Sequence, residues 1–414
     1  MKKNLLCAVL MSAYLFLFGV QRSQAADLTI DSQAAIAYEY HSGQVLYEHN
    51  SQAKLPVASL SKLLTIYLTL SEIKSGRLQW DTQIPLSDYA KELNQNLDIS
   101  NPHMSNNSYS AKELIESTLI VSANSSAVAL AEYIAGSEPR FVDQMLKQVQ
   151  AWGIRDATIV NATGLNNSML GRHIYPGSKP DEENAFSARD LALITQHLLH
   201  DFPEINTITA QPFLKWENEQ MANSNLLLPG QTFALQGVDG LKTGTTAKAG
   251  QSLLATASHN GMRFVLILLH AGEANKADDK RFVEAKKALT YLYDHYQATV
   301  ITPTSPILPQ TWPVSGGTKS KLAIYTRGKL TIIHPKNQPL ARQHIKVKLS
   351  HAQAPITKQQ KLGHMSYQVD SFSPSLAYLD KQPDLSIYAK EDLPRQGFWS
   401  SIKNWLKTSL FINK

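Results

Sequence analysis

The sequence predicts an α/β protein in which an antiparallel sheet, with a helical insertion, is flanked by helices and followed by a small all-β domain. Strand-like segments occur in two groups, at residues 34–48 and 233–270, with helical patterns between them. Both groups contain turns that are too short for parallel pairing, so their strands are expected to pair antiparallel. After residue 300, helical periodicity gives way to short strand-like segments among prolines.

Residues 1–25 have the composition of a secretory signal peptide. Two lysines precede a largely apolar stretch at residues 5–20, and Ser23 and Ala25 supply small residues before a cleavage point. The apolar stretch is shorter than the ~20 residues that usually span a bilayer, which favours a cleaved signal over a retained anchor. We therefore expect an exported chain.

The composition excludes several classes of function. The single cysteine, Cys7, lies in the signal, so the mature chain has no disulfide, thiolate metal site or cysteine nucleophile. The net charge of +6 falls to +3 without the three basic residues of the signal. A charge this small gives no support for nucleic-acid binding. A hydrophobic content of 43% is sufficient for a sizeable core.

Residues 26–299 are expected to form the first domain, in which strands from both ends of the segment share one sheet. The strand-like stretches, bounded by turn residues, are 34–41, 44–48, 233–243, 251–258 and 262–270. Asn260-Gly261, between the last two, is a strong signal for a two-residue hairpin turn.

Helical patterns fill the remainder of this domain. They cover residues 60–73, 110–150, 187–200 and 278–296. The first helix is apolar on nearly all sides, which predicts a buried, central position, and Gly76 ends it. Capping pairs, Ser110 with Glu113 and Ser187 with Asp190, open two of the others. A helical insertion spanning roughly residues 60–230 should therefore cover the sheet.

Residues 300–394 are expected to form the separate β domain, and residues 395–414 an amphipathic helix. The strand-like stretches of the β domain are 322–325, 330–333, 345–349 and 365–369. In the tail, an apolar face that includes Trp399 and Trp405 lies opposite Lys403 and Lys407. This pattern is typical of a helix that lies in a membrane surface, and packing against the β domain is the alternative.

Ser59-Leu60-Ser61-Lys62 opens the buried helix and supplies a candidate nucleophile and base. Side chains at i and i+3 share a helix face, and a backbone N–H at a helix start is free to stabilise an oxyanion. A neighbouring lysine can act as base if burial and other cations lower its pKa. The same spacing recurs at Ser51/Lys54, Ser71/Lys74 and Ser400/Lys403. Only Ser59 and Lys62 open an apolar helix.

Two further motifs are candidates for the same site. Ser122-Ala123-Asn124 lies between helical stretches, where a hydroxyl and an amide could face a cleft. Lys242-Thr243-Gly244 is the only Lys-Thr-Gly in the chain and ends a predicted strand. Glycine there lets a substrate backbone approach closely, and Lys242 would supply a positive charge for a carboxylate. Other Ser-x-Asn matches lie in a polar loop, 105–107, and in a hairpin turn, 258–260.

The order S-x-x-K, S-x-N, K-T-G is that of penicillin-binding proteins and class A β-lactamases. The wider sequence resembles the low-molecular-mass penicillin-binding proteins of the D-alanyl-D-alanine carboxypeptidase family over nearly the whole mature chain. The stretches that carry the resemblance are Gly43-Gln-Val-Leu-Tyr47, Pro56-Val-Ala-Ser-Leu-Ser-Lys62, Leu130-Ala-Glu-Tyr-Ile-Ala-Gly136, Asn161-Ala-Thr-Gly-Leu165 and Val238-Asp-Gly-Leu-Lys-Thr-Gly-Thr245. Ser61 stands where the family often has Thr, and Thr245 stands where some members have His. Neither difference removes a reacting group.

The resemblance implies a β-lactamase/transpeptidase-like fold for residues 26–299 and a role for each matched residue. Ser59 would be the nucleophile that forms an acyl-enzyme, Lys62 its general base and Ser122 the proton relay. Residues implied in substrate binding are Asn124, Lys242, Thr243, Thr245 and Arg281. The backbone N–H groups of Ser59 and Thr245 would form the oxyanion hole.

The resemblance also implies an activity and a location. The enzyme would remove the terminal D-alanine from peptidoglycan pentapeptides without a metal or other cofactor. β-Lactam antibiotics would inhibit it covalently. The chain would be peripheral on the outer face of the cytoplasmic membrane, held there by its C-terminal helix.

Other functions remain as alternatives. A D,D-endopeptidase or transpeptidase of the same fold would use the same acyl-enzyme with a different peptide or acceptor. A β-lactamase would need a deacylating Glu in an E-x-x-L-N loop, and none occurs between Asn124 and Lys242. A zinc peptidase could use His197, His200 and Asp201, but the chain has no H-E-x-x-H. A wall-binding module would not need Ser59, Lys62 and Lys242 together.

Overall fold

The computed structural model describes residues 28–350, 352–369 and 378–397. Contacts separate the chain into residues 1–30 and a unit of residues 31–414, which holds every element named below. The expected signal peptide and residues 398–414 of the expected amphipathic helix lie outside the described residues. Within the described ranges, every helix is too short or too polar to cross a membrane.

A five-stranded antiparallel sheet, with strand order β2-β1-β11-β10-β9, forms the centre of the first part of the chain. Its strands are β1 (Ala34–Glu39), β2 (Val45–His49), β9 (Val238–Thr246), β10 (Gly250–His259) and β11 (Met262–Leu269). Ile36 of β1 lies opposite Ile267 of β11, so the two ends of this part of the chain share the sheet, as predicted. Asn260 and Gly261 have positive φ angles of 48° and 76°, as a two-residue hairpin turn requires.

The strand expected from residue 233 begins only at Val238. Gly237 has a φ of 89°, and the Val238 N–H donates to the Leu235 carbonyl, so the chain turns immediately before the strand. Residues 233–237 therefore form a loop, and this boundary of the prediction was wrong.

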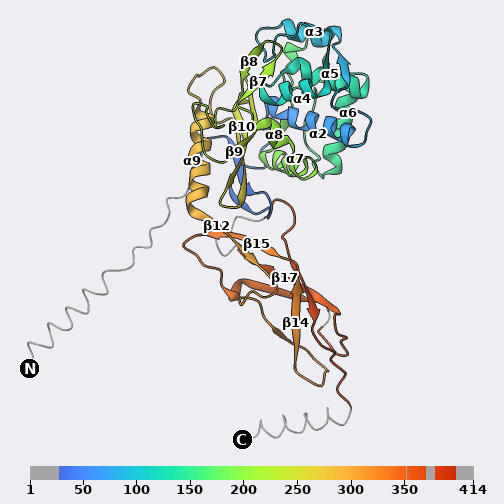
Figure 1. Ribbon diagram of the computed structural model, residues 1–414, viewed down its shortest axis with the longest axis vertical. Helices are drawn as coiled ribbons and strands as arrows, with labels where there is room; N and C mark the ends of the chain where they lie inside the picture. Colours follow the sequence, from blue (N-terminus) through green and yellow to red (C-terminus); the bar gives the residue numbers. More distant parts are fainter. Residues whose placement is uncertain (1–27, 351, 370–377, 398–414) are drawn as a thin grey trace, which may run out of the picture. The chain divides into compact units, whose positions relative to one another are not determined.

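Helices cover both faces of the sheet (Figure 1). They are α2 (Lys62–Lys74), α3 (Asp88–Gln95), α4 (Ala111–Ile120), α5 (Asn124–Ala135), α6 (Glu138–Ala151), α7 (Ala188–Asp201), α8 (Ile205–Thr209) and α9 (Lys280–His295). Helix α9 packs on β10 and β11, and the others gather on the opposite side. The predicted capping boxes of Ser110 and Ser187 are both formed.

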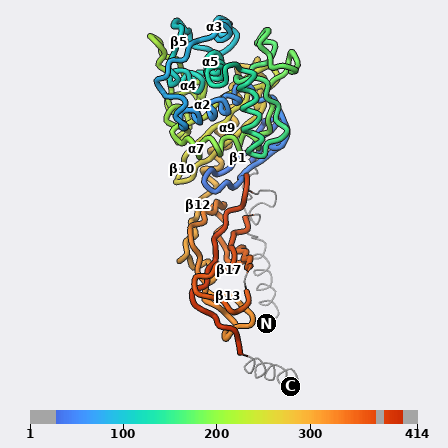
Figure 2. Tube along the Cα trace, turned by 90° about the vertical axis from the view of Figure 1, so that its right-hand side faces the viewer, coloured from blue at the N-terminus to red at the C-terminus, as the bar shows by residue number. Residues whose placement is uncertain are grey.

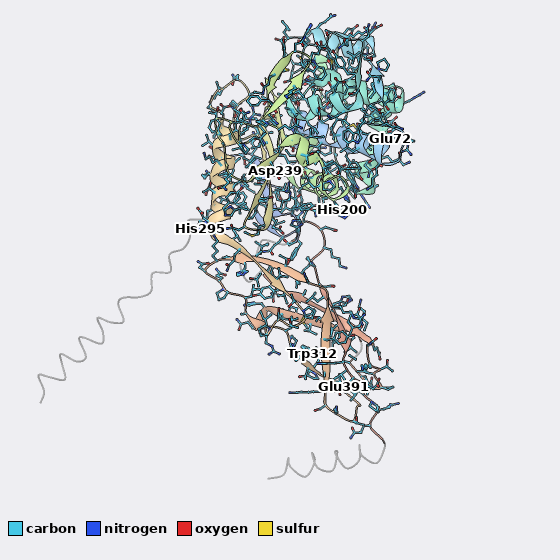
Figure 3. All side chains as sticks on the ribbon, viewed as in Figure 1. Glu72, His200, Asp239, His295, Trp312 and Glu391 are labelled. Carbon is cyan, nitrogen blue, oxygen red and sulfur yellow. The ribbon has the colours of Figure 1, made fainter. Side chains whose placement is uncertain are left out.

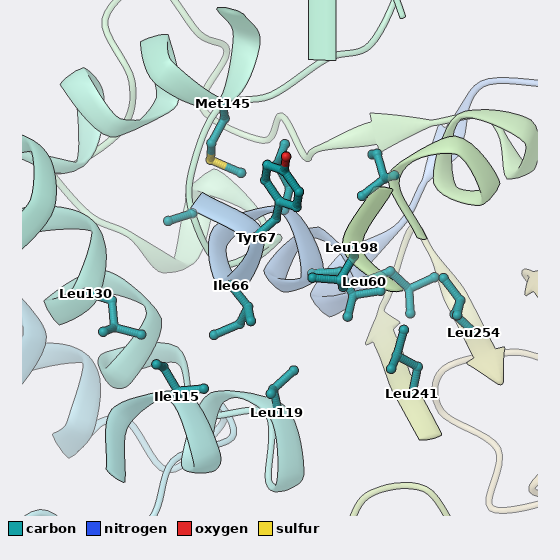
Figure 4. Close-up of a cluster of buried hydrophobic side chains, with 14 of the residues drawn as sticks. Leu60, Ile66, Tyr67, Ile115, Leu119, Leu130, Met145, Leu198, Leu241 and Leu254 are labelled. Atoms are coloured by element: carbon teal, nitrogen blue, oxygen red, sulfur yellow. The ribbon is translucent and has the colours of Figure 1, made fainter. Parts of the chain in front are cut away.

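Helix α2 lies at the centre of the main core, as its apolar sides predict. Figure 4 shows Ile66 and Tyr67 of α2 surrounded by Ile115, Leu130 and Met145 of the neighbouring helices. Ile66, Ile115, Leu130 and Met145 are fully buried. Such a helix cannot shift without opening cavities in the core, so it is a rigid base for residues at its N-terminus.

Short elements that the sequence did not predict hold the loops of the helical insertion. The paired strands are β3 (Leu55–Pro56) with β6 (Ala185–Phe186), β4 (Gln83–Pro85) with β5 (Ser108–Ser110), and β7 (Phe213–Trp216) with β8 (Glu219–Ala222). The 3-10 helices are η1 (Ala58–Ser61), η2 (Asn167–Met169) and, later in the chain, η3 (Arg342–His344). Of these, η1 matters most, because it directly precedes α2.

A second group of strands follows α9 (Figure 2, orange to red). They are β12 (Tyr296–Ile301), β13 (Thr311–Pro313), β14 (Lys321–Arg327), β15 (Leu330–Pro335), β16 (Ile345–Leu349), β17 (Lys361–Tyr367) and β18 (Leu385–Ala389). Five form a sheet in the order β13-β14-β18-β17-β16, and β12 pairs with β15. Their buried side chains, including Leu322, Ile332, Leu362 and Ile387, form a core of their own.

Candidate active site

Ser59 lies in η1, on a strained turn immediately before α2. Ala58 has a φ of 49°, in the left-handed region that residues other than glycine rarely adopt. Gly164 packs against this turn so closely that a Cβ there would lie 1.8 Å from the Ala58 carbonyl oxygen. The turn is thus held from outside as well as by its own hydrogen bonds, which is how strained conformations persist at functional sites.

The Lys62 ammonium lies at the centre of the site. Its Nζ is 2.8 Å from each of three oxygens, Ser59 Oγ, Asn124 Oδ1 and the Thr163 carbonyl. The side chain is fully buried. A charged lysine donates three hydrogen bonds, whereas a neutral amine donates two and accepts one. The same geometry therefore allows neutral Lys62 to accept the Ser59 hydroxyl proton.

The electrostatics of the site favour that neutral form. Burial lowers the pKa of Lys62 well below its usual value, and the nearby positive charge of Lys242 lowers it further. The Glu138 carboxylate acts in the opposite direction. A lysine with a lowered pKa can serve as general base near neutral pH.

The Ser-x-Asn motif lies between α4 and α5. Asn124 is the first residue of α5, and its Nδ2 donates to the Ser100 carbonyl at 2.9 Å while its Oδ1 accepts from Lys62. Ser122 is 6% exposed, with a φ of 65°. Among the described residues, its hydroxyl has no hydrogen-bond partner. The structure thus brings Asn124 to Lys62 and places Ser122 at the adjoining turn.

Strand β9 carries the Lys-Thr-Gly motif along the edge that faces η1. A Cβ on Gly244 would lie 2.7 Å from the Val57 carbonyl and 3.3 Å from the Ser59 backbone nitrogen. Only glycine lets the two backbones approach this closely. Lys242 and Thr243 are buried, and Thr243 Oγ1 donates to Ser224 Oγ at 2.9 Å.

Arg281, from the first turn of α9, reaches the end of the motif. One of its terminal nitrogens donates to Thr245 Oγ1 at 2.8 Å and to the Gly244 carbonyl at 3.0 Å. Burial and the charge of Arg281 lower the pKa of Lys242 to about 7. Two neighbouring basic groups that are largely removed from solvent favour the arrival of an anion.

Two contacts of the site were not predicted from the sequence. Thr163 holds Lys62 through its carbonyl, in a loop where Asn161 Oδ1 accepts from the backbone N–H groups of Thr163 and Gly164. The Asn-x-Thr-Gly pattern of an Asx turn was the available signal. Ser224 was not detectable, because its partner Thr243 is 19 residues away.

Glu138 was also missed, although it is the buried carboxyl behind the site. Its Oε1 accepts from the Ala162 N–H at 2.8 Å, and its Oε2 accepts from the Tyr89 hydroxyl at 3.1 Å. Burial raises the pKa of this carboxyl to about 7. It therefore supports the loop that binds Lys62.

The histidines considered for a metal site have other partners. The His197 ring stacks on Trp152 with centroids 4.4 Å apart, and His200 Nδ1 lies 2.9 Å from Asp201 Oδ1. In the described part of the chain, His, Cys, Asp and Glu side chains form no group of three that could hold a metal ion.

A serine hydroxyl against a buried lysine, with an amide on one side and a basic strand edge on the other, is the arrangement that activates a serine nucleophile for acyl transfer. Residues 20–273 match the model of the D-alanyl-D-alanine carboxypeptidase family, peptidase family S11. The chain belongs to this family, which confirms the prediction, and it is a serine peptidase of the D-Ala-D-Ala carboxypeptidase type.

Relatives match both in sequence and in structure. D-alanyl-D-alanine carboxypeptidase DacC of Escherichia coli (strain K12) is 29% identical over 409 residues, covering 94% of this chain and 92% of the relative. The crystal structure of PBP3 from Streptococcus pneumoniae, a peptidoglycan synthesis regulatory factor, is 34% identical, with a TM-score of 0.74 over 88% of this chain and all of that one. Penicillin-binding protein D2 of Listeria monocytogenes, in its ampicillin-bound form, is 29% identical, with a TM-score of 0.54 over 64% of this chain and 98% of that one.

Proposed function

We propose that this enzyme removes the terminal D-alanine from peptidoglycan stem pentapeptides through an acyl-enzyme on Ser59. Neutral Lys62 takes the hydroxyl proton as Ser59 Oγ attacks the carbonyl carbon of the penultimate D-alanine. The proton reaches the leaving D-alanine amine through Ser122, and the C–N bond breaks. Water then hydrolyses the Ser59 ester. The observation that carries this proposal is the 2.8 Å contact between Ser59 Oγ and a fully buried Lys62 Nζ.

Substrate binding is assigned to the two sides of the Ser59 turn. Asn124 would hydrogen-bond the peptide on the helical side. Lys242 and the hydroxyls of Thr243 and Thr245 would hold the terminal carboxylate on the β9 side. Arg281 supports this side by its hydrogen bond to Thr245 and by its charge. The Ser59 and Thr245 backbone N–H groups would stabilise the oxyanion.

Benzylpenicillin provides the test, since β-lactams acylate the same serine in this class of enzyme. Intact-protein mass after incubation should show one long-lived adduct, absent from Ser59→Ala. Ser51→Ala is the matched control, because Ser51 and Lys54 have the same spacing. Lys54 Nζ instead donates to the Asp156 carbonyl, and Ser51 Oγ to Glu48. An adduct that survives Ser59→Ala contradicts the assignment, and rapid turnover of penicillin would indicate a β-lactamase.

The same acyl-enzyme could be resolved by an amine, as in a transpeptidase, or formed on a cross-linked peptide, as in an endopeptidase. Product analysis distinguishes these activities from carboxypeptidase action. Free D-alanine released from monomeric pentapeptide, without cross-linked product, supports hydrolysis. Cleavage of purified cross-linked dimers at a comparable rate would instead assign an endopeptidase.

The proposal extends to the location of the enzyme. Residues 1–25 would direct export, and the amphipathic segment 395–414 would hold the chain at the outer face of the cytoplasmic membrane. The sequence pattern supports this, because a Trp-containing apolar face lies opposite Lys403 and Lys407.

A further inference from the structure

The β-rich part of the chain is strongly basic, in contrast to the part that carries the active site. Residues 302–397 contain 13 Lys and Arg but only five Asp and Glu, a formal charge of +8, whereas residues 26–301 carry −8. A charge concentrated on one part of a chain indicates an anionic partner for that part. The catalytic chemistry does not account for this charge.

A groove of about 400 Å³ lies in this part of the chain, between the two edge strands of the five-stranded sheet. Its lining includes Trp312, Pro313 and Lys321 from one side and Arg342, Ile345 and Val347 from the other. We call it the β13–β16 groove. Beyond it the two edges are tied together, because Ser315 exchanges backbone hydrogen bonds of 2.9 Å with Ala352 and Ala354. The groove is therefore a built feature of a nearly closed sheet.

The floor of the groove is apolar and its rim is basic. Trp312, Ile345 and Val347 pack against the β-domain core yet remain partly exposed. Figure 3 labels Trp312 in this region. Lys321 and Arg342, which line the groove, are exposed. Lys346 and Lys348 are exposed too, but they alternate with Ile345 and Val347 along β16 and so belong to the other face of that strand. Within the described ranges, no Asp or Glu forms an ion pair with any of these four cations.

Three of the five acidic residues of this part of the chain have partners outside the groove. Glu391 pairs with Lys319 at 3.0 Å, and Asp384 lies 3.0 Å from His364. Asp392 accepts from the Lys358 N–H. The charge of the groove is therefore not neutralised by these carboxylates.

The edges of the groove are unsuited to an added peptide strand. Pro313 has no N–H to donate, and the exposed lysines of β16 are typical of edges that are protected against strand pairing. What remains is a partly exposed indole ring in a groove that Lys321 and Arg342 also line. An aromatic face packs on the apolar face of a sugar ring, and Lys and Arg bind carboxylates through charge-assisted hydrogen bonds.

We propose that the β13–β16 groove binds a peptidoglycan strand, with Trp312 against a sugar ring and Lys321 and Arg342 on carboxylates of its peptides. The choice of polymer rests on the proposed function, because the stem peptides that the active site cleaves are attached to such a strand. Binding the polymer at a second site raises the effective concentration of its peptides at Ser59. The groove should therefore affect action on polymeric substrate and leave short soluble substrates unaffected.

The test measures binding of the full chain to insoluble, purified peptidoglycan sacculi in detergent, with Ser59→Ala to prevent turnover. Trp312→Ala and the pair Lys321→Glu with Arg342→Glu should each weaken binding about tenfold or more. Lys329→Glu with Lys390→Glu is the matched control, because both residues are exposed, outside the groove, and change the net charge equally. Circular dichroism checks that Trp312→Ala is folded, and the charge pair tests the groove if it is not.

With Ser59 restored, the groove variants should keep wild-type kcat/KM on diacyl-Lys-D-Ala-D-Ala and show a higher KM on polymeric pentapeptide strands. Equal loss of binding in the control pair, or unchanged binding in both groove variants, overturns the proposal. Weaker binding to vesicles of anionic lipid with unchanged sacculus binding overturns it in favour of a membrane surface. Failure of the proposed function is distinguishable, since it would remove D-alanine release in the wild type without affecting sacculus binding.

Discussion

Glu138→Gln should stabilise the protein increasingly as the pH rises from 4.5 to above 7. The Glu138 carboxyl is fully buried, and its pKa is raised from 4.5 to about 7. Below pH 4.5 it is protonated in both the folded and the unfolded chain. Between these values only the unfolded chain ionises, so folding becomes less favourable as the pH rises. At 1.36 kcal/mol per pH unit, the penalty reaches about 3 kcal/mol above pH 7.

Glutamine has nearly the same shape and cannot ionise. Its carbonyl oxygen can still accept from the Ala162 N–H, and its amide can donate to the Tyr89 hydroxyl. The free energy of unfolding, measured with urea from pH 4.5 to 8.5, should therefore lose the downward trend that Glu138 causes. Tyr89→Phe is an informative companion, because the Tyr89 hydrogen bond lowers the pKa of Glu138. Without this hydrogen bond, the fall in the free energy of unfolding should continue to higher pH.

The same substitution has a kinetic consequence of known sign. Above about pH 7, where Glu138 is ionised, its charge raises the pKa of Lys62, so its removal lowers that pKa further. The acid limb of kcat/KM for acylation should therefore move to lower pH in Glu138→Gln. If the difference in unfolding free energy between wild type and variant stays constant from pH 4.5 to 8.5, Glu138 ionises over the same pH range in the folded and unfolded chains, and the reasoning from burial is wrong.

Four further outcomes are expected. Lys242→Gln should lower kcat/KM on diacyl-Lys-D-Ala-D-Ala by about ten- to a few hundred-fold, because a charge-assisted hydrogen bond is worth roughly 1.5–3 kcal/mol. The loss should be smaller on the amidated peptide, which lacks the carboxylate. Equal losses on both peptides would indicate that Lys242 acts on the pKa of Lys62. In the wild type, preference for the free carboxylate should decline as the pH rises through about 7, where Lys242 loses its proton. Gly164→Ala should lower the free energy of unfolding by about 3 kcal/mol or more and abolish acylation, because the new Cβ would overlap the Ala58 carbonyl. Gly177 has a similar φ but no atom within 4 Å of the position that a Cβ would take, so Gly177→Ala is the control and should cost only about 1 kcal/mol, measured by thermal unfolding. Removal of residues 396–414 should release the enzyme from membranes with full soluble activity, and continued sedimentation with membranes would place the anchor elsewhere.

Local patterns were sufficient to predict the main elements of the fold. The Asn260-Gly261 turn, the Ser110 and Ser187 capping boxes and the apolar sides of α2 each have a local physical cause, and each is present in the structure. These features depend on residues within about four positions of one another. A single sequence shows such spacings directly.

Boundaries that depend on tertiary contacts were predicted less well. Helix α2 begins at Lys62, and Ser59 lies in the preceding 3-10 turn, because Gly164 packs against the Ala58 carbonyl. Residue 296 was assigned to a helix but begins β12, which pairs with β15 more than 30 residues later. The short strands β13 and β18 also escaped prediction. No local pattern shows a partner that distant in the chain.

Motif order gave the candidate residues of the site but not their electrostatic environment. The sequence shows that Lys62 follows Ser59 by three positions, yet not that the Thr163 carbonyl, 101 residues away, would lie 2.8 Å from its nitrogen. It also does not show that Glu138 lies behind that loop. Because burial is the largest cause of the lowered pKa of Lys62, the reactivity of the motif is a tertiary property.

Three buried ionisable groups oppose one another in a way that suits the proposed chemistry. Burial favours the neutral form of Lys62, Lys242 and Glu138 alike, and it is the largest cause of each pKa shift. Ionisation of Glu138 makes Lys62 a stronger base, whereas protonation of Lys242 makes it easier to deprotonate. A substrate carboxylate bound at Lys242 would compensate that positive charge and raise the basicity of Lys62 at the moment when Ser59 must lose its proton. The free carboxylate of the substrate would then increase both its own affinity for the site and the basicity of Lys62. This gives the arrangement a physical reason to prefer a peptide with a free C-terminus.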